Sequence, residues 1–419
     1  MPQIPRDKWP DSTLALMSDP YRFISKRCRR YQSDLFEARL MLRKTICMTG
    51  RDGAALFYDE DRFTRSGVAP AWLQKTLFGQ GGVQGLDREA HRHRKQMFMS
   101  LMAPERIERL GAIAGDWWQV YARKWAGADR VVLYGEVNEI LSRAVCAWAG
   151  VPLAEPEVGR RTTELMAMFD RAATLSPAHL WSRLARRRAE RWIGDLIEDI
   201  RAGRLKPPEE SAAWVVAMHR DLKGGLLDRH TAAVELINVL RPTVAVSVFI
   251  TFAALALHQY PACRERLAAG EAGYADLFAQ EVRRFYPFFP AVMARVRHDF
   301  EWKGYHFPKG RRVVLDLYGT NHDPRTWEEP EAFRPERFRR WDGCPFDFIP
   351  QGGGDHHRNH RCPGEWIAVE LIKVSSGFLA GGITYDMPEQ DLRIDYGRLP
   401  ALPRSRFIIN NVRLPTTRK

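Results

Sequence analysis

One stretch gathers a thiol, glycines and several basic side chains: Phe348 to Trp366, which reads F-I-P-Q-G-G-G-D-H-H-R-N-H-R-C-P-G-E-W. Its three consecutive glycines, 352–354, permit positive φ and let the backbone lie close to a flat, bulky group. Cys362 follows them, just before an apolar run that is typical of a helix. We expect the helix dipole, Arg361 and His360 to lower the pKa of this thiol and favour a thiolate. A thiolate on a glycine-rich loop indicates an axial ligand of haem iron.

Two other roles for this cysteine are open at this point. Most lone cysteines in intracellular chains are inert core residues. Alternatively, neighbouring histidines could bind zinc together with cysteines, as a set made of His356, His357, His360, Cys362 and Cys344. The spacing of these residues matches no paired zinc-ligand framework, and a structural zinc site needs four closed ligands. The haem-thiolate interpretation is favoured over both.

The composition indicates a large globular chain that does not bind nucleic acid. Of the 419 residues 45% are hydrophobic, which is ample for a large core and excludes disorder. The net charge of +13 is spread along the chain, and its densest runs, Lys26 to Arg30 and Arg183 to Arg191, have the pattern of solvated helix faces. No nucleic-acid-binding module accompanies them. A basic surface could also attract anionic substrates such as fatty acids.

The cysteines and the N-terminal residues predict a cytoplasmic protein. Six cysteines lie scattered without a disulfide framework, which favours free thiols in a reducing compartment. The opening residues, M-P-Q-I-P-R-D-K-W-P-D, lack the apolar core of a signal peptide.

The periodicity predicts a mainly α protein with a minor β region. A hairpin is expected over 34–48 and a small sheet over 292–318. Residues 106–201 read as almost wholly helical, with breaks at 150–152 and 175–177. The segment from about His230 to His258 reads as one central helix. Its uninterrupted apolar part, Thr243 to Leu257, is shorter than the ~18 to 20 residues of a membrane span, so we expect a buried core helix and no stable membrane anchor.

Three motifs then follow one another in a recognisable order. They are an E-x-x-R pair (Glu281, Arg284), the segment D-P-x-x-W-x-x-P-x-x-F-x-P-x-R-F over 323–338, and the glycine-rich loop with Cys362 and Gly364. This order, over the whole length of the chain, resembles the cytochromes P-450. The resemblance implies a single catalytic domain, residues 1–419, with the mostly helical haem-thiolate fold.

The resemblance also implies a cofactor and a structural network. The cofactor is haem b, with Cys362 as the metal ligand. The network is a buried Glu281–Arg284–Arg337 cluster that braces the haem loop. By analogy alone, His91, Arg65 and Lys95 are expected to contact the haem propionates.

Two departures from ordinary cytochromes P-450 resemble the bacterial fatty-acid peroxygenases, which use hydrogen peroxide and need no redox partner. The cysteine loop is lengthened, and Arg241 and Pro242 replace the acid–alcohol pair of the central helix. Pro242 should kink that helix. Arg241 would place a cation in an apolar cavity, where a bound carboxylate can satisfy it bidentately. An internal pair with Glu235 is the alternative, but six residues of separation put the two side chains on different helix faces.

This subgroup resemblance implies that Arg241 and Pro242 are catalytic. A long-chain fatty acid would bind Arg241 through its carboxylate, which then serves as the general acid–base for peroxide. Fixing the carboxylate presents the α or β carbon to the iron. Gln84 stands where decarboxylases of the subgroup often carry histidine, which favours a hydroxylase.

The pocket walls are expected to be aromatic. The segment F-Y-P-F-F-P-A-V, 285–292, looks most like the α-hydroxylating branch, and Phe288 would wall the pocket beside the haem. Phe78 and Phe289 are further lining candidates, with ordinary core packing as the alternative. The competing functions are a fatty-acid β-hydroxylase or decarboxylase giving terminal alkenes, a redox-partner-dependent monooxygenase, and a non-catalytic zinc or haem sensor.

Overall fold

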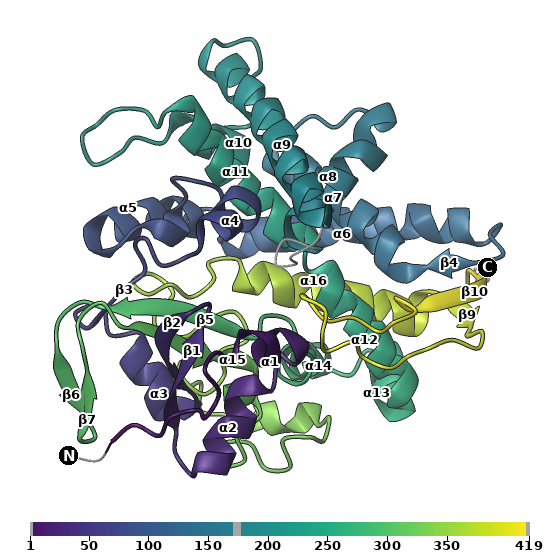
Figure 1. Cartoon of the computed structure of the whole chain (residues 1–419). Coiled ribbons are helices and arrows are strands. Elements are labelled where there is room, and N and C mark those ends of the chain that lie inside the picture. The colour runs from purple at the N-terminus through teal and green to yellow at the C-terminus, as the bar shows by residue number, and fades with distance from the viewer. Residues whose placement is uncertain (1–2, 171–176, 416–419) are drawn as a thin grey trace.

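Helices make up the largest share of the chain, and the strands lie in two places, the main sheet with β6 and β7 at the lower left and β4, β9 and β10 at the right (Figure 1). The computed structural model describes residues 3–170 and 177–415. The helices are α1 (Thr13–Ser18), α2 (Phe23–Tyr31), α3 (Gly50–Phe57), α4 (Ala71–Leu73), α5 (Arg88–Met99), α6 (Pro104–Trp125), α7 (Leu133–Ala149), α8 (Val158–Asp170), α9 (Pro177–Arg201), α10 (Ala212–Met218), α11 (Arg229–Val244), α12 (Ser247–Gln259), α13 (Pro261–Ala268), α14 (Tyr274–Phe285), α15 (Leu317–Asn321) and α16 (Glu365–Gly377). Short helical turns are η1 (Gln74–Phe78), η2 (Val83–Gly85), η3 (Glu155–Glu157), η4 (Pro335–Arg339) and η5 (Phe378–Gly382).

The main sheet joins strands from the N-terminal part of the chain with strands from residues 291–316. The strands are β1 (Leu35–Leu40), β2 (Arg43–Met48), β3 (Phe63–Thr64), β4 (Val131–Val132), β5 (Ala291–Val296), β6 (Phe300–Trp302), β7 (Tyr305–Phe307), β8 (Arg312–Asp316), β9 (Thr384–Asp386) and β10 (Ile408–Arg413). Five of them form a sheet in the order β1-β2-β8-β5-β3. The predicted hairpin over 34–48 is β1 and β2, and β2 pairs in parallel with β8. The mainly α fold with a minor β region is therefore confirmed.

The core lies between α6, α7, α11, α12 and α16, which pack against one another. Two buried polar contacts fix the helix positions. The Trp118 indole N–H donates to Ser375 Oγ at 3.0 Å, which joins α6 to α16. The Ser247 hydroxyl donates to Asn138 Oδ1 at 2.9 Å, which joins α12 to α7. Hydrogen bonding makes it possible to bury such groups in an apolar core.

The central segment is two helices rather than the single helix that we predicted. α11 contains Pro242 and ends at Val244, and α12 begins at Ser247. Proline has no N–H to donate to the carbonyl four residues earlier, so the helix is weakened there. The stretch 229–259 is apolar enough to cross a membrane, but 94% of its most apolar window is buried inside the protein. It is a core segment, as expected.

The helical reading of 106–201 holds with additional interruptions. α7 ends at Ala149 and Gly150 follows in the left-handed conformation with φ 73°, at the predicted break. A further break with the short strand β4 separates α6 from α7 and was not predicted. The second predicted break, 175–177, lies largely outside the described residues.

A buried carboxylate ties α14 to the proline-rich segment 323–338. Glu281 is fully buried and binds Arg284 at 2.7 Å and Arg337 at 3.2 Å. It also accepts a hydrogen bond from the Arg334 backbone N–H at 2.7 Å. Arg284 donates in turn to the carbonyl of Asn321 at 3.0 Å. The segment has no regular secondary structure of its own over most of its length, so these bonds hold its shape.

Replacing Glu281 should destabilise the fold. In Glu281→Gln, the buried Arg284 and the half-buried Arg337 lose their counter-charge, and breaking a buried pair in this way costs about 3–5 kcal/mol. Urea unfolding followed by circular dichroism measures the loss. The matched control is Glu271→Gln, which removes a surface carboxylate that pairs with Arg266 and Arg339. We expect that control to unfold like the parent protein. Equal unfolding midpoints for Glu281→Gln and the parent would contradict the role of the network.

Candidate active site

Glycines and one backbone hydrogen bond fix the conformation of the cysteine loop. Gly352 and Gly354 have φ of 94° and 83°, in the left-handed region that favours glycine. A Cβ on Gly353 would lie 2.7 Å from the Pro345 carbonyl oxygen, so this glycine is needed for close approach. The Cys362 N–H donates to the Gln351 carbonyl at 3.0 Å. The loop therefore presents the Cys362 sulfur in a defined position.

The prediction that the pKa of the Cys362 thiol is lowered is wrong for the protein without a bound metal. Burial raises the pKa of Cys362, and Glu365 raises it further, although the Gly364 N–H, Lys95 and Arg283 act in the opposite direction. The helix α16 begins at Glu365, three residues after Cys362, so the predicted position of the cysteine just before a helix N-terminus is confirmed, but burial outweighs the helix dipole. A metal cation bound at the sulfur deprotonates a thiol outright. The site is thus suited to a metal ligand rather than to a free thiolate.

A second buried charge network, absent from our sequence prediction, lies next to Cys362. Glu365 is buried and contacts Arg283, Arg361 at 2.7 Å and His356 at 2.9 Å. Although burial acts against it, these partners hold the pKa of Glu365 far below its usual range. Arg361 and Glu365 are four residues apart, a spacing that could have indicated a pair, whereas Arg283 comes from α14 and is distant in the sequence.

The zinc hypothesis is wrong. His356 pairs with Glu365, and the His360 ring stacks on His91 with ring centroids 3.9 Å apart. Over residues 3–170 and 177–415, no three His, Cys, Asp or Glu side chains are grouped so that they could hold a metal ion.

The three predicted propionate contacts lie on the cysteine-loop side of the protein, close to one another. Lys95 is buried, and its ammonium group donates to the carbonyls of Asn359 and, at 2.6 Å, Arg361. Arg65 donates to the Met293 carbonyl at 2.7 Å. The buried His91 has its Nδ1 without a hydrogen-bond partner among the described residues. Burial, and then Lys95, lower the pKa of His91 to about 4. Lys95 thus braces the cysteine loop, a role that was not predicted.

These residues fit a haem. Cys362 would supply the sulfur ligand of the iron, the glycines leave room for a flat macrocycle, and the positive groups around His91 suit anionic propionates. Contacts of His91, Arg65 and Lys95 with the propionates remain a prediction, because Lys95 and Arg65 also bond to the backbone.

Arg241 is a buried cation that has no carboxylate partner in the described part of the chain. Its only hydrogen bond there is a long one, 3.5 Å from Nη2 to Asn238 Oδ1, and its Nε has none. Glu235, the alternative partner, instead binds Arg94 at 2.8 Å. Burial lowers the pKa of Arg241 to about 9; the charge of Arg186 contributes, and Cys362 acts in the opposite sense. Arg241 therefore lies within electrostatic range of the cysteine, still protonated at neutral pH.

Gln84 is connected to Arg241 through one side chain. Asn238 Nδ2 donates to Gln84 Oε1 at 3.3 Å and to Glu235 Oε2 at 3.0 Å, while Asn238 Oδ1 accepts from Arg241. The chain of contacts fixes the orientation of the Asn238 amide, and with it one side of the Arg241 guanidinium.

Arg186 is a site residue that we missed. We interpreted the run 183–191 as a solvated face, but Arg186 is 1% exposed. It pairs with Glu190 at 2.7 Å and lies close enough to Arg241 to lower its pKa. Ala185 and Ala189 are buried as well, so the helical period of small residues in the run could have indicated an inward face.

The three aromatic candidates differ in their environments. Phe288 packs on Phe249 with ring centroids 4.5 Å apart, and the Tyr21 hydroxyl fixes its carbonyl at 2.9 Å. Phe289 is 38% exposed and touches Phe288 edge-on. Phe78 ends η1 and is half-buried against the main core. Their position relative to a bound substrate remains a prediction.

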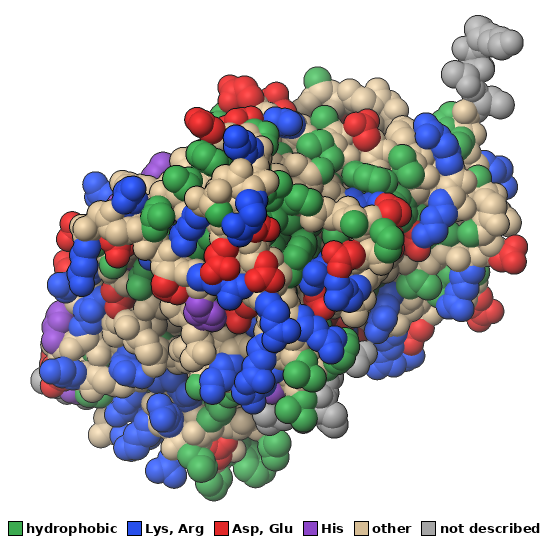
Figure 2. Space-filling model, turned by 90° about the horizontal axis from the view of Figure 1, so that it is seen from above, with side chains coloured by type: hydrophobic (Ala, Val, Ile, Leu, Met, Phe, Trp, Pro, Cys, Tyr) green, Lys and Arg blue, Asp and Glu red, His purple; other side chains and the backbone are tan. Residues whose placement is uncertain are grey.

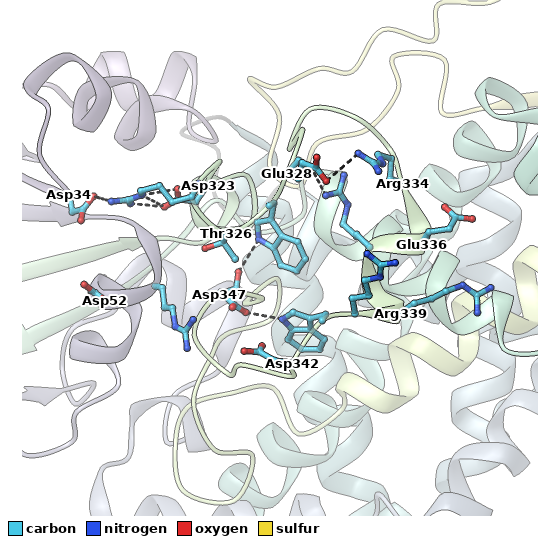
Figure 3. Close-up of a pocket in the computed structure, with 16 residues that line it drawn as sticks. Asp34, Asp52, Asp323, Thr326, Glu328, Arg334, Glu336, Arg339, Asp342 and Asp347 are labelled. Atoms are coloured by element: carbon cyan, nitrogen blue, oxygen red, sulfur yellow. Dashed lines mark hydrogen bonds and ion pairs between the residues drawn. The ribbon is translucent and has the colours of Figure 1, made fainter.

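A polar cleft of about 890 Å³ lies along segment 323–342, and Arg337 of the Glu281 network is among its lining residues (Figure 3). Several of its acidic and basic side chains bind one another. Arg325 pairs with Asp34 at 2.8 Å and with Asp323 at 2.6 Å, and the Trp341 indole donates to Asp347 at 3.0 Å. These contacts hold the segment in place.

The family model and the similar solved structures all indicate the same protein family. The cytochrome P450 family model matches residues 271–375. Cytochrome P450SP alpha (CYP152B1), solved in complex with (R)-ibuprofen, is 56% identical, with a TM-score of 0.95 over 97% of this chain and 100% of that chain. Cytochrome P450EX alpha (CYP152N1), solved with myristic acid, is 44% identical, with a TM-score of 0.95 over 98% of this chain and 99% of that one. Ligand-free cytochrome P450 OleT is 37% identical, with a TM-score of 0.97 over 99% and 100%.

These matches span essentially the full length of each chain, and they agree with the fold described above. The family and subgroup predicted from the sequence are confirmed. This chain belongs to the cytochrome P450 family, in its CYP152 group, and is a haem-thiolate oxidoreductase.

Proposed function

We propose that this protein is a peroxygenase that hydroxylates long-chain fatty acids at the carbon next to the carboxylate. Hydrogen peroxide supplies the oxygen: one of its oxygen atoms enters the Cα–H bond and the other leaves as water, so no external electrons are needed. On this basis the enzyme needs no redox partner. The free state of all six cysteines supports a cytoplasmic location.

The observation that carries the proposal is the buried, unpaired charge of Arg241. A guanidinium ion without a counter-charge is costly in an apolar interior, and a carboxylate is its natural bidentate partner. The two relatives solved with carboxylic acids, (R)-ibuprofen and myristic acid, support this assignment. A redox-partner-dependent monooxygenase is disfavoured because Arg241 and Pro242 stand in place of the acid–alcohol pair that activates dioxygen.

The residues of this chain prepare the reaction by positioning and proton transfer. Bound haem supplies the iron chemistry that activates peroxide and oxidises a C–H bond. Arg241 holds the substrate carboxylate, while Asn238 and Gln84 hold Arg241. The carboxylate then accepts a proton from one peroxide oxygen and returns it to the oxygen that leaves as water. Because the carboxylate is anchored, the first methylene groups are the nearest to the reacting centre.

Pro242 and Phe288 shape the space around the anchored carboxylate. Pro242 weakens α11 just before its end at Val244, so the helix stops within one turn after Arg241. The backbone of Phe288 is fixed by the Tyr21 hydroxyl and its ring packs on Phe249 and Phe289, so the ring can serve as a firm wall. A firm wall beside the first methylene favours Cα over Cβ.

The role of Cys362 can be tested by its spectrum. Cys362→Ala should abolish the thiolate-type spectrum of the reduced carbon monoxide complex and all oxygenation, because the axial sulfur is lost. Cys344→Ala, which removes another buried cysteine, should keep both. If Cys362→Ala retained the thiolate-type spectrum, the ligand would be another cysteine.

The role of Arg241 can be tested by fatty-acid kinetics. Arg241→Ala should bind haem normally but lose about a hundredfold or more in kcat/KM for myristic acid with peroxide, as expected when a buried charge pair loses one partner. A titration of the haem spectrum with fatty acid reports binding separately. Arg241→Lys keeps the charge without the planar fork and should be intermediate. Unchanged kinetics in Arg241→Ala would rule out the carboxylate anchor.

The position of hydroxylation is the most demanding test. Product analysis of myristic acid with peroxide, without any reductase, should give the α-hydroxy acid as the main product and little alkene. A difference of about 1 to 2 kcal/mol between two transition states decides the outcome. Phe288→Ala removes the wall and should increase the β-hydroxy share. If β-hydroxy acid or terminal alkene predominated in the parent enzyme, the α assignment would fail while peroxygenase activity would stand.

A further inference from the structure

The outward side of the first half of α9 combines apolar and basic residues. We call this surface the α9 outer face. Its members recur at intervals of one and three residues, which places them on one side of a helix. They are Leu180, Trp181, Leu184, Arg187, Arg188 and Arg191. Exposed fractions are 63%, 44% and 45% for the three apolar side chains, unusually large for neighbouring residues of these types.

The arginines of this face are not neutralised. Within residues 3–170 and 177–415, no carboxylate lies within 4.0 Å of Arg187, Arg188 or Arg191. Farther along the same helix the pattern changes, because Asp195 and Glu198 both pair with Arg229. The unpaired positive charge is thus confined to the half of the helix that also exposes its apolar side chains.

The opposite side of the same half-helix faces the site. Arg186 is buried, its Nη1 lies 3.4 Å from the Leu77 carbonyl, and η1 with Phe78 packs against α9. α9 lies at the top of the molecule in Figure 1. Figure 2 looks down on this side and shows Lys and Arg side chains next to hydrophobic ones in its lower half. A surface bound to the α9 outer face would therefore lie one helix away from the predicted substrate pocket.

We propose that the α9 outer face binds the surface of an anionic phospholipid bilayer. Trp181, Leu180 and Leu184 would enter the headgroup boundary, while the arginines contact lipid phosphates, as in helices that lie in a membrane interface. The net charge of +13 favours an anionic surface as well. A second copy of this chain fits less well, because a symmetric pairing of this face would set arginine against arginine.

The biological use of this contact rests on the proposed function. Long-chain fatty acids partition into bilayers, so a peroxygenase that docks reversibly would take its substrate from the lipid surface. Docking itself does not depend on the reaction, and the two can be tested separately.

The test is flotation of the holoenzyme with vesicles. The parent protein should float with vesicles of equal parts phosphatidylglycerol and phosphatidylcholine, but not with pure phosphatidylcholine, and added salt should weaken the contact. Arg187→Glu/Arg188→Glu should bind at least about tenfold more weakly, and Trp181→Ala/Leu184→Ala should also lose binding. The matched control, Arg29→Glu/Arg30→Glu, makes the same change in charge on exposed α2 and should float like the parent.

Three outcomes would overturn the proposal. They are a parent protein that does not float, equal losses in the α9 and α2 charge reversals, or a dimer in solution that Trp181→Ala/Leu184→Ala dissociates without any vesicle binding. The carbon monoxide spectrum of each variant verifies folding. Peroxide-driven turnover of a dispersed fatty acid is measured alongside. If flotation behaved as expected while turnover failed, the docking surface would stand and the proposed function would fall.

Discussion

Glu365 is a buried carboxylate, and much of the site is arranged around the need to neutralise it. Arg283 reaches it from α14, and Arg361 and His356 reach it from the cysteine loop. A buried charge without partners would destabilise the fold by several kcal/mol, roughly 3–5 for a broken pair. The carboxylate therefore connects α14, the cysteine loop and α16. Lys95 adds a second connection by donating to two carbonyls of the same loop. The sulfur of Cys362 owes its position to this set of contacts.

Charges are neutralised within the protein beside Cys362 but not beside Arg241. Beside Cys362, acid and base are balanced within the protein, so the ligand is held rigidly. Around Arg241, the described residues provide the Asn238 amide and a second cation, Arg186, but no carboxylate, since Glu235 is already paired with Arg94. The protein thus keeps one cation desolvated and available. Binding a carboxylate there gains the electrostatic energy that the fold does not recover internally. The free-energy cost of burying Arg241 without a counter-charge therefore favours a substrate that carries a carboxylate.

α9 connects that site with the outside. Along one run of nine residues, Arg186 faces inward toward η1 and the vicinity of Arg241, whereas Arg187, Arg188 and Arg191 face solvent. The same residue type therefore has two unrelated roles within two helical turns. The apolar residues that accompany the outer arginines distinguish this surface from an ordinary solvated one. Such a surface would bring the enzyme to a bilayer in which a water-insoluble substrate is dissolved.

The sequence by itself determined the family and the parts of the site that are local in the chain. The order of Glu281, Arg284, the segment 323–338 and the cysteine loop predicted the fold, and the adjacent Arg241 and Pro242 predicted the subgroup. Each of these motifs consists of residues that are close together in the chain, so the sequence shows it directly. Propensity likewise predicted the hairpin and the buried central segment.

Only the tertiary structure decided what depends on distant partners and on burial. The contact of Arg283 with Glu365 joins residues 82 positions apart, and no local pattern shows it. The helix dipole and neighbouring cations suggested an acidic Cys362, but burial outweighs them and raises its pKa. Arg186 looked solvated because charge predicts exposure, yet helix packing turned it inward. In each case the deciding quantity is the free energy of removing a group from water, which depends on everything that the fold places around it.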